Sequence, residues 1–517
     1  MIFSPADKKF LTVVTAIIVI IAAIPFIYAV MSTPNGMAYS GRHAQNSGDY
    51  AVYFSQMEQA RQGHMLFLNL FTSESHARTI FDPVWLVLGW ISRVTGLSIP
   101  LTFHVARLIA IPLFISVAAR FVWTMLDDAR ERRVALLMIS FGGGITGYAK
   151  TTDASAFHAM QFSPHVVLSL TFLLAIFLLM YRSFHLHIIR YAVYAGFLGL
   201  VLFFFHPYHI STTYGILGAY AMVMIFLRRS PAWSIISSFA VYVALSVPAV
   251  LYYWLFFKLS PIGSGWLAQS DSLMHARPPW EILWSFAPLV LLALIGYKVL
   301  LNERREQAIF MVTWIVIALT LMWTPWFFRM RTIGGMTIPL SIASAAGIVW
   351  LLRIVALRKS AMAWSMVLII AIIGTTMPVH GMTFIHNIAV YAQQVDYAYI
   401  SDELVDVIRV YRQQATDTDV LLASPYTSNI IPALTGRKVY IGHGIQTLSS
   451  HQKVKDINAF FSRAANDDPT YTELRSLGIT FLLITPKEQE LGMLPLDNAP
   501  FLQIAAREGP YSLYRVR

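Results

Sequence analysis

Long apolar runs, separated by short polar and basic segments, dominate residues 1–380 of the chain. About eleven of these runs approach the length of roughly 20 residues that a helix needs to cross a bilayer. The pattern therefore predicts a mainly α-helical, polytopic membrane protein with about eleven transmembrane helices. The predicted spans lie at about 10–31, 100–125, 134–148, 165–181, 191–205, 210–227, 234–257, 282–301, 308–323, 332–355 and 362–378.

A polar and aromatic segment follows the first run, and residues 31–99 are predicted to form a large first outer loop. Between Gly48 and Gly63 the aromatic and apolar residues recur at helical spacing, which predicts an amphipathic helix. Asp82 opens an apolar run that is too short to span a bilayer. Because this run contains Trp85 and Trp90, we expect an interfacial or re-entrant helix there.

The pattern changes after residue 380. Segments rich in β-branched and aliphatic residues at 419–423, 439–441, 479–484 and 512–516 predict strands, and they alternate with segments of helical pattern. Strands that alternate with helices predict a small α/β domain. We therefore expect a transmembrane domain over 1–380 and an extracytoplasmic α/β domain over 381–517.

Composition supports a membrane protein. Of the 517 residues, 56% are hydrophobic and 13% are charged, whereas a soluble domain carries roughly 25% charged residues. The net charge of +11 reflects basic loops between the runs, which favours cytoplasmic loops over a nucleic-acid surface and places the N-terminus inside and the tail outside. The absence of cysteine excludes a disulfide or a thiolate metal site. One basic residue from each loop predicted to lie inside is Lys8, Arg132, Arg182, Arg228, Arg304 and Arg358.

The carboxylate of Asp49 is the leading candidate for chemistry, because it lies just beyond the first run in the outer loop. A carboxylate in such a place can act as a general base, and it can equally cap the start of the helix. Tyr50 and Tyr53 lie beside Asp49 as candidate substrate-binding residues. Glu58, on the same predicted helix, is a further candidate, with a solvated helix face as the alternative.

A metal site is a second possibility for the first loop. Glu74 and His76 could bind a divalent ion together with Asp49, since carboxylate and imidazole ligands suit Mg, Mn or Zn. The spacing of these residues is irregular, so the pattern alone does not select a metal.

Cations and histidines at the outer ends of the runs could hold an anionic group of a substrate. Arginine can bind a phosphate through two parallel hydrogen bonds, and snorkelling toward the interface is the ordinary alternative. For the two histidines on either side of Pro207, the alternative is a structural turn. The candidates are Lys150, His206, His209, His275, Arg277, Arg329 and Arg331.

Two parts of the chain resemble a known superfamily. Gly48-Asp49-Tyr50 follows the first run, and a Pro-led segment from Asp82 to Ser98 comes next. The segment Leu434–His443 of the tail is similar to extracytoplasmic tails of bacterial members. The chain thus resembles the GT-C superfamily of integral membrane glycosyltransferases, and it looks closest to the branch of protein O-mannosyltransferases and bacterial lipid A aminoarabinose transferases.

The resemblance implies a function. It implies a polyprenyl-phosphate-linked sugar as donor, a glycan, lipid or protein as acceptor, and inverting transfer at the outer face of a bacterial cytoplasmic membrane. By position it makes Asp49 the catalytic residue. Many relatives carry a paired acidic motif, whereas Tyr50 follows Asp49 here, so the need for a metal stays open.

Two other classes of function fit a polytopic chain. One is a transporter or flippase of a lipid-linked saccharide, and the other is a non-catalytic membrane protein of polysaccharide assembly. A transporter typically shows internal repeats, broken helices in matching halves or charges in the middle of a span. The sequence shows no clear repeat and carries most of its charges in loops, which together with the long first loop favours an enzyme.

Overall fold

The computed structural model divides the chain into two compact units. The helical unit comprises Met1–Pro25, His104–Tyr253 and Asp271–His386, and the mixed unit comprises Phe26–Phe103, Trp254–Ser270 and Asn387–Arg517. The residues described are 3–43, 46–145, 154–228, 232–273, 278–324, 329–357, 360–463, 468–492, 496 and 499–517.

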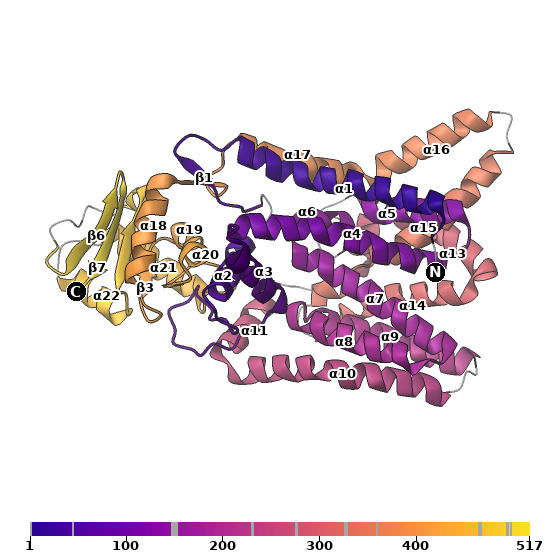
Figure 1. Cartoon of the computed structure of the whole chain (residues 1–517), viewed down its shortest axis with the longest axis horizontal. Helices are drawn as coiled ribbons and strands as arrows, with labels where there is room; N and C mark the ends of the chain where they lie inside the picture. Colours follow the sequence, from indigo (N-terminus) through magenta and orange to yellow (C-terminus); the bar gives the residue numbers. More distant parts are fainter. Residues whose placement is uncertain are drawn as a thin grey trace. The chain divides into compact units, whose positions relative to one another are not determined.

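The helical unit is built from apolar helices, as the long apolar runs predict (Figure 1). The elements that lie wholly or mostly in this unit are α1 (Pro5–Met31), α4 (Ile99–Met125), α5 (Ala129–Phe141), α6 (Ala156–Phe162), α7 (Pro164–Leu186), α8 (Ile189–Phe205), α9 (His209–Arg228), α10 (Ala232–Leu259), α12 (Pro279–Ser285), α13 (Ala287–Glu303), α14 (Arg305–Leu321), the 3-10 helix η2 (Arg329–Ile333), α15 (Thr337–Val355), α16 (Ala361–Thr376) and α17 (Pro378–Ala392).

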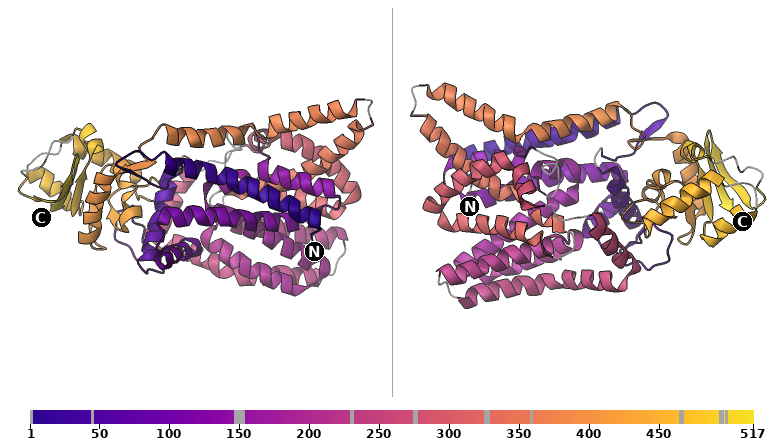
Figure 2. Two further views of the ribbon diagram at one scale, coloured as in Figure 1. Left: turned by 45° about the horizontal axis from the view of Figure 1, so that its top comes forward. Right: turned by 180° about the vertical axis from the view of Figure 1, so that it is seen from behind.

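The chain is a mainly α-helical polytopic membrane protein, as predicted. Among the described residues, six helices are long and apolar enough to cross a bilayer, namely α1, α4, α7, α9, α10 and α15. A seventh span arises if α16 and α17 count as one, although a break bends this pair by 52° (Figure 2). The predicted number of about eleven was higher because α5, with 13 residues, and α8, α13 and α14, with 17 residues each, are helices that fall short of that length.

Two helices of this unit, α13 and α15, approach closely (Figure 1). A side chain at Gly296 of α13 would collide with the carbonyl oxygen of Ala343, and one at Gly347 of α15 would collide with the carbonyl oxygen of Leu292. Glycine therefore permits the contact of these two backbones, which is a common way for helices to associate inside a membrane.

A buried arginine joins three further helices of the unit. Arg107 of α4 is 2% exposed, and its guanidinium donates to the backbone oxygens of Ala22 in α1 and Met160 in α6, each at 2.9 Å. A charged side chain inside such a helix bundle is stable only when it is hydrogen-bonded. These two bonds therefore hold α1 and α6 against α4.

The mixed unit combines the first outer loop with the tail. Its elements are β1 (Met37–Tyr39), α2 (Ser47–Arg61), α3 (Pro83–Thr95), α11 (Pro261–Leu273), β2 (Tyr399–Ser401), α18 (Asp402–Gln414), β3 (Val420–Leu422), α19 (Pro425–Ser428), α20 (Ile431–Thr435), β4 (Lys438–Val439), α21 (Ser450–Arg463), α22 (Asp468–Ser476), β5 (Phe481–Ile484), α23 (Pro486–Glu490), β6 (Leu502–Glu508) and β7 (Tyr511–Val516).

The tail forms a five-stranded mixed sheet in the order β4-β3-β5-β7-β6 (orange to yellow in Figure 1). β3 runs parallel to β4 and β5, whereas β7 runs antiparallel to β5 and β6. Strands β3, β4, β5 and β7 correspond to the predicted strands. β6 was not predicted, because it is an edge strand with mostly exposed side chains and no apolar run marks it.

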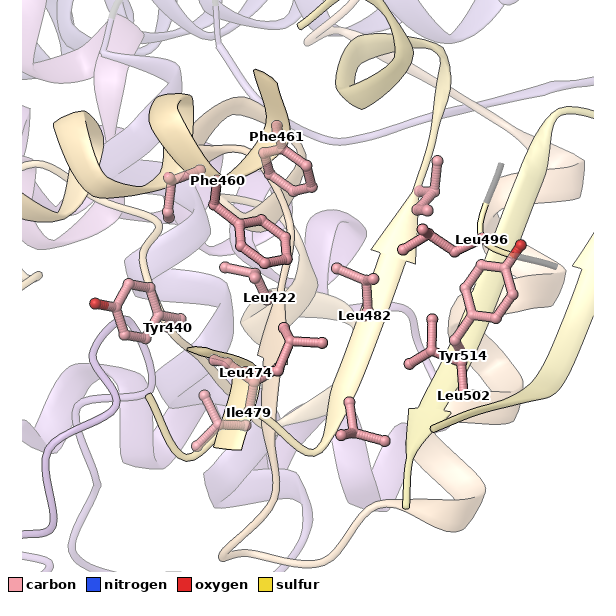
Figure 3. Packing of buried hydrophobic residues seen from close by; sticks show 14 of the residues in the cluster. Leu422, Tyr440, Phe460, Phe461, Leu474, Ile479, Leu482, Leu496, Leu502 and Tyr514 are labelled. Carbon is pink, nitrogen blue, oxygen red and sulfur yellow. The ribbon is translucent and has the colours of Figure 1, made fainter. Parts of the chain in front are cut away.

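Both faces of this sheet are covered. On one face Leu422, Leu482 and Tyr514 pack against Phe460 of α21 and Leu474 of α22 (Figure 3). On the other face, the ring of Tyr411 in α18 meets the ring of Phe481 edge-on, at 5.1 Å between centroids. Side chains alternate between the two faces along a strand, so this arrangement gives the α/β architecture that the tail predicts.

Strand pairing also ties the first loop to the tail within the mixed unit. β1 and β2 form an antiparallel pair in which Ala38 opposes Ile400. In addition, the backbone N–H of Val439 donates to the carbonyl oxygen of Leu70 at 2.9 Å. The first loop and the tail are therefore held together by backbone hydrogen bonds.

The close approach of α13 and α15 can be tested by adding one methyl group. We expect Gly296→Ala to destabilise the protein by about 1–3 kcal/mol, because a side chain there meets the backbone of α15. Gly374→Ala on α16 is the matched control, since nothing lies within 4 Å of a side chain at that position. Thermal unfolding in detergent measures both, and equal unfolding midpoints would contradict the packing described here.

Candidate active site

Asp49 lies in the first turn of α2, and its side chain is 33% exposed. The N-cap position of the helix is taken by Asn46, which adopts a left-handed backbone conformation. The Asp49 carboxylate instead contacts the imidazole of His443, with 3.0 Å between Oδ1 and Nε2. Asp49 is thus paired with a residue of the tail and does not occupy the cap position.

The hydrogen bonds around His443 indicate which ring nitrogen carries the proton. Its Nδ1 accepts from the backbone N–H groups of Ile445 and Gln446, each at 3.3 Å. A nitrogen that accepts these bonds has no proton of its own, so in the neutral ring the proton lies on Nε2. His443 therefore donates from Nε2 to Oδ1 of Asp49, which leaves the second carboxylate oxygen free of this bond.

Gly48 makes room for this pair. A methyl group at position 48 would lie 3.1 Å from Cδ2 of His443 and 3.5 Å from its Nε2. The first of these contacts is tighter than ordinary van der Waals packing, so a side chain at this position would require the ring of His443 to shift. The glycine of Gly48-Asp49-Tyr50 thus has a packing role toward His443.

The loop that carries His443 is fixed by the first outer loop. Thr447 donates from its hydroxyl to the carbonyl oxygen of Phe71 at 2.7 Å, and Asn69 donates from Nδ2 to the carbonyl oxygen of Gln446 at 2.6 Å. The backbone N–H of Leu448 donates to the hydroxyl of Thr72 at 3.2 Å. These bonds hold the histidine in place before any ligand arrives, which is what a positioning residue requires.

The aromatic residues beside Asp49 lie inside the loop. Tyr50 is fully buried, and its ring stacks on His43 and packs near Phe103. Tyr53 is half-buried and stacks on Trp85 at 4.6 Å between ring centroids. Tyr50 thus offers no exposed ring face to a substrate in this structure, and both residues build the core that supports α2.

Glu58 is buried, so the interpretation of a solvated helix face is wrong. Its side chain is 1% exposed and lies between two arginines, at 2.6 Å from Nη2 of Arg61 and 2.8 Å from Nη2 of Arg412. Gln62 also donates to it at 3.0 Å. A buried carboxylate needs such partners, and here they join α2 of the first loop to α18 of the tail.

Glu74 and His76 do not form a ligand set with Asp49. Burial acts to raise the pKa of Glu74, but hydrogen bonds from Lys453 and Thr72 outweigh it and hold the pKa below its ordinary value. Nε2 of His76 accepts from the backbone N–H of Asn69 at 3.1 Å, so its Nδ1 donates to the carbonyl oxygen of Glu74 at 2.8 Å.

Both nitrogens of His76 are thus occupied, and neither has a lone pair left for a metal ion. Over the ranges that the structure describes, no group of three or more His, Asp or Glu residues could hold a metal. The residues present therefore do not fit the predicted divalent ion at Asp49, Glu74 and His76.

In the helical unit, three histidines and one arginine gather around the start of α9. His206 stacks on His209 at 4.7 Å between ring centroids, and the ring of His165 lies 5.9 Å from that of His206. The guanidinium of Arg331 lies over the ring of Tyr208 at 5.4 Å. The cluster thus brings together three of the residues predicted to bind an anionic group, namely His206, His209 and Arg331.

Lys150, His275 and Arg277 lie outside the described residues. Arg329 begins the same 3-10 helix that carries Arg331.

Comparison with known proteins gives a clear answer for the fold. No family model matches the chain, and no curated protein matches it. Among solved structures, the chain is similar to the oligosaccharyltransferase of Archaeoglobus fulgidus in its apo form, with a TM-score of 0.59 and 13% identity over 96% of this chain and 73% of that one.

It is also similar to the arabinofuranosyltransferase AftD from Mycobacteria, with a TM-score of 0.62 and 12% identity over 100% of this chain and 40% of that one. A third similar structure is ArnT from Cupriavidus metallidurans bound to undecaprenyl phosphate, with a TM-score of 0.51 and 12% identity over 97% of this chain and 98% of that one. All three are GT-C glycosyltransferases.

The chain has the GT-C fold. This finding confirms the fold that the resemblance implies. Within the GT-C fold of this chain, the mixed unit carries the Asp49–His443 pair, and the helical unit carries the cluster of His165, His206, His209 and Arg331.

Sequence reasoning missed two of these residues. His443 stands at the end of the tail segment that carried the resemblance, but a lone histidine after a glycine gives no signal of chemistry. His165 follows a proline at the start of a long apolar run, a position that is typical of the end of a transmembrane helix. Only their partners, Asp49 and His206, mark them as members of a site.

Asp82 gives this region a dependence on pH. It caps α3 by accepting from the backbone N–H groups of Val84 and Trp85, and burial raises its pKa from an ordinary value of 3.8 to about 7. A carboxyl group whose pKa is higher in the folded than in the unfolded chain stabilises the fold fully at a pH below its pKa in the unfolded chain. This contribution is lost as the pH rises through the folded pKa of about 7.

We therefore expect the unfolding midpoint of the wild type to fall between pH 5 and pH 8 by more than that of Asp82→Asn, which keeps the cap and removes the titration. Thermal unfolding of both proteins over this range is the measurement. Identical pH profiles for the two would show that Asp82 does not titrate as stated.

Proposed function

We propose that this protein is an inverting glycosyltransferase that uses a polyprenyl-phosphate-linked sugar as donor and acts at the outer face of a bacterial cytoplasmic membrane. The single observation that carries the proposal is the Asp49–His443 pair, a carboxylate oriented by an imidazole in the first loop of a GT-C fold. The proposal includes an N-terminus in the cytoplasm and an extracytoplasmic domain over 381–517.

In the proposed reaction Asp49 is the general base. A hydroxyl group of the acceptor attacks the anomeric carbon of the sugar, its proton moves to the free oxygen of Asp49, and the carbon–oxygen bond to the phosphate breaks. The electron pair of that bond leaves on the phosphate oxygen. His443 keeps its proton throughout and holds the other carboxylate oxygen, so that the base points in one direction.

The leaving phosphate needs positive charge or hydrogen-bond donors. In the proposal this role falls to Arg331 with His206 and His209, whose rings stack on one another. Arg329 shares the 3-10 helix of Arg331 and is a further candidate for the same role. Lys150, His275 and Arg277 remain candidates from the sequence alone.

The choice of donor draws support from two of the similar proteins. ArnT from Cupriavidus metallidurans has been solved with undecaprenyl phosphate, and the archaeal oligosaccharyltransferase AglB with an inhibitory peptide and a dolichol-phosphate. A polyprenyl phosphate as leaving group and a hydroxyl-bearing glycan, lipid or protein as acceptor would suit the same fold. The chemistry assigned to Asp49 requires no metal ion to be invoked.

The role of Asp49 can be tested by sugar transfer in proteoliposomes. We expect Asp49→Asn to lose transfer by about 10²–10⁴-fold, because a general base contributes that much to the rate. Asp406→Asn is the matched control: it removes an exposed carboxylate of α18 in the same unit and should transfer at the wild-type rate. Radiolabelled polyprenyl-phosphate sugars and an extract of envelope acceptors would be supplied.

Two further outcomes separate the alternatives. Full activity of Asp49→Asn would remove Asp49 from the mechanism. No transfer by the wild type with any donor, together with movement of labelled lipid between leaflets, would favour a flippase. Gly48→Ala tests the histidine without changing an ionisable group: it should slow transfer while leaving donor binding intact, because the added methyl displaces His443.

The phosphate-holding role makes a separate prediction. Arg331→Gln removes the charge over Tyr208 and should weaken binding of undecaprenyl phosphate about tenfold or more, since a charge-assisted pair is lost. Arg120→Gln on α4, which loses an exposed arginine of the same unit, should bind like the wild type. Binding by titration calorimetry in zwitterionic nanodiscs is the readout, and equal affinities would refute this role.

A further inference from the structure

Arg42 is a buried cation in the mixed unit, seven residues before Asp49 in the sequence. It is 6% exposed. Its guanidinium donates from Nε to the hydroxyl of Ser40 at 3.4 Å and from Nη1 to Oδ1 of Asn429 at 3.3 Å. Both acceptors are neutral, both bonds are long, and a guanidinium has five N–H donors, so these two bonds engage only part of its donor capacity.

Over the described ranges, Arg42 forms no ion pair with a carboxylate. Burial lowers the pKa of Arg42 to about 10, with nearby tyrosines acting in the opposite direction, so the group stays charged at neutral pH. Burying a charge without a counter-ion is strongly unfavourable. Glu58 of the same unit shows the contrast, since two arginines surround its buried carboxylate.

The backbone of Arg42 is fixed by two phenols. The hydroxyl groups of Tyr39 and Tyr391 donate to its carbonyl oxygen, at 3.3 Å and 3.1 Å. These bonds connect the start of the first loop to Tyr391, which belongs to the same unit. The guanidinium is therefore held at a defined place, and a bound anion would not have to organise it.

Asn429 extends this donor group toward Asp49. Because its Oδ1 accepts from Arg42, its amide nitrogen must face the other way. That nitrogen lies 3.7 Å from where a methyl group at Gly48 would be, and Cδ2 of His443 lies 3.1 Å from the same point. Donors from Arg42 and Asn429 thus lie beside the residues that carry the candidate base.

We propose that Arg42 and Asn429 form a binding site for an oxyanion of a substrate, next to the Asp49–His443 pair. The inference rests on the proposed function for the identity of the substrate, but its geometry does not depend on that function. The anion is a phosphate or a carboxylate. Its source is either the phosphate of the lipid-linked donor or an acidic group of the acceptor, and the experiment below separates these two.

The first test is direct binding of three probes to the full-length protein in zwitterionic nanodiscs. The probes are undecaprenyl phosphate, inorganic phosphate and galacturonate, measured by titration calorimetry. Arg42→Gln should weaken binding of at least one probe tenfold or more, and Arg42→Lys should weaken it less, because a lysine keeps the charge without the planar donors. Arg93→Gln removes an exposed arginine of the same unit and should bind like the wild type.

The pattern over the probes identifies the source. An effect on undecaprenyl phosphate and inorganic phosphate assigns the anion to the donor, whereas an effect confined to galacturonate assigns it to the acceptor. Wild-type affinity of Arg42→Gln for all three probes would overturn the proposal. A wild type that binds none of the probes would overturn it as well.

A second test separates binding from structure. Asn429→Asp replaces the side-chain amide group by a carboxylate and so supplies Arg42 with an anionic partner. We therefore expect a higher unfolding midpoint together with a tenfold or greater loss of anion binding. A merely structural Arg42 would give the rise in stability with unchanged binding. Asn429→Ala should weaken binding without raising stability.

These readouts do not require sugar transfer. A protein that binds undecaprenyl phosphate through Arg42 but transfers no sugar would refute the proposed function and leave this inference standing. A protein that transfers sugar normally with Arg42→Gln, and binds all probes as the wild type does, would refute the inference alone.

Discussion

A single hydrogen bond of 3.0 Å, from Nε2 of His443 to Oδ1 of Asp49, links residues 394 positions apart in the chain. It forms because other hydrogen bonds hold the loop of His443 against the first outer loop. Thr447, Asn69 and Thr72 tie the histidine loop to the first outer loop. Since the cost of ordering these backbone segments is met when the protein folds, the carboxylate is oriented before a substrate binds.

Two buried charged residues of the mixed unit, Glu58 and Arg42, differ in their partners. Glu58 has two arginines and a glutamine around it, and so it behaves as a structural joint between α2 and α18. Arg42 is buried to a similar degree but has only neutral partners among the described residues. Because proteins tolerate an uncompensated charge mainly where function requires it, the asymmetry between the two residues indicates a ligand at Arg42.

Much of the fold could be predicted from the sequence, since apolar runs of about 20 residues and alternating strand patterns are local signals. The predicted count of about eleven spans exceeds the six or seven of spanning length among the described residues, because α8 is apolar but has 17 residues and α5 has only 13. The edge strand β6 was missed because its side chains are exposed. Asp49 was identifiable from its position, but its partner was not, because no local pattern reports a contact between the first loop and residue 443.

The interpretation of Glu58 failed for the same reason. In the sequence Glu58 stands among Gln56, Gln59 and Arg61, which is typical of the solvated face of an amphipathic helix. Its ion pair with Arg412 of the tail has no local signal. Two glycines mark close contacts that the charged residues do not indicate. Gly48 beside Asp49 and Gly296 in α13 each stand where another element comes too close for a side chain, so in a chain with this fold an unexplained glycine near a carboxylate indicates a neighbour that the sequence does not name.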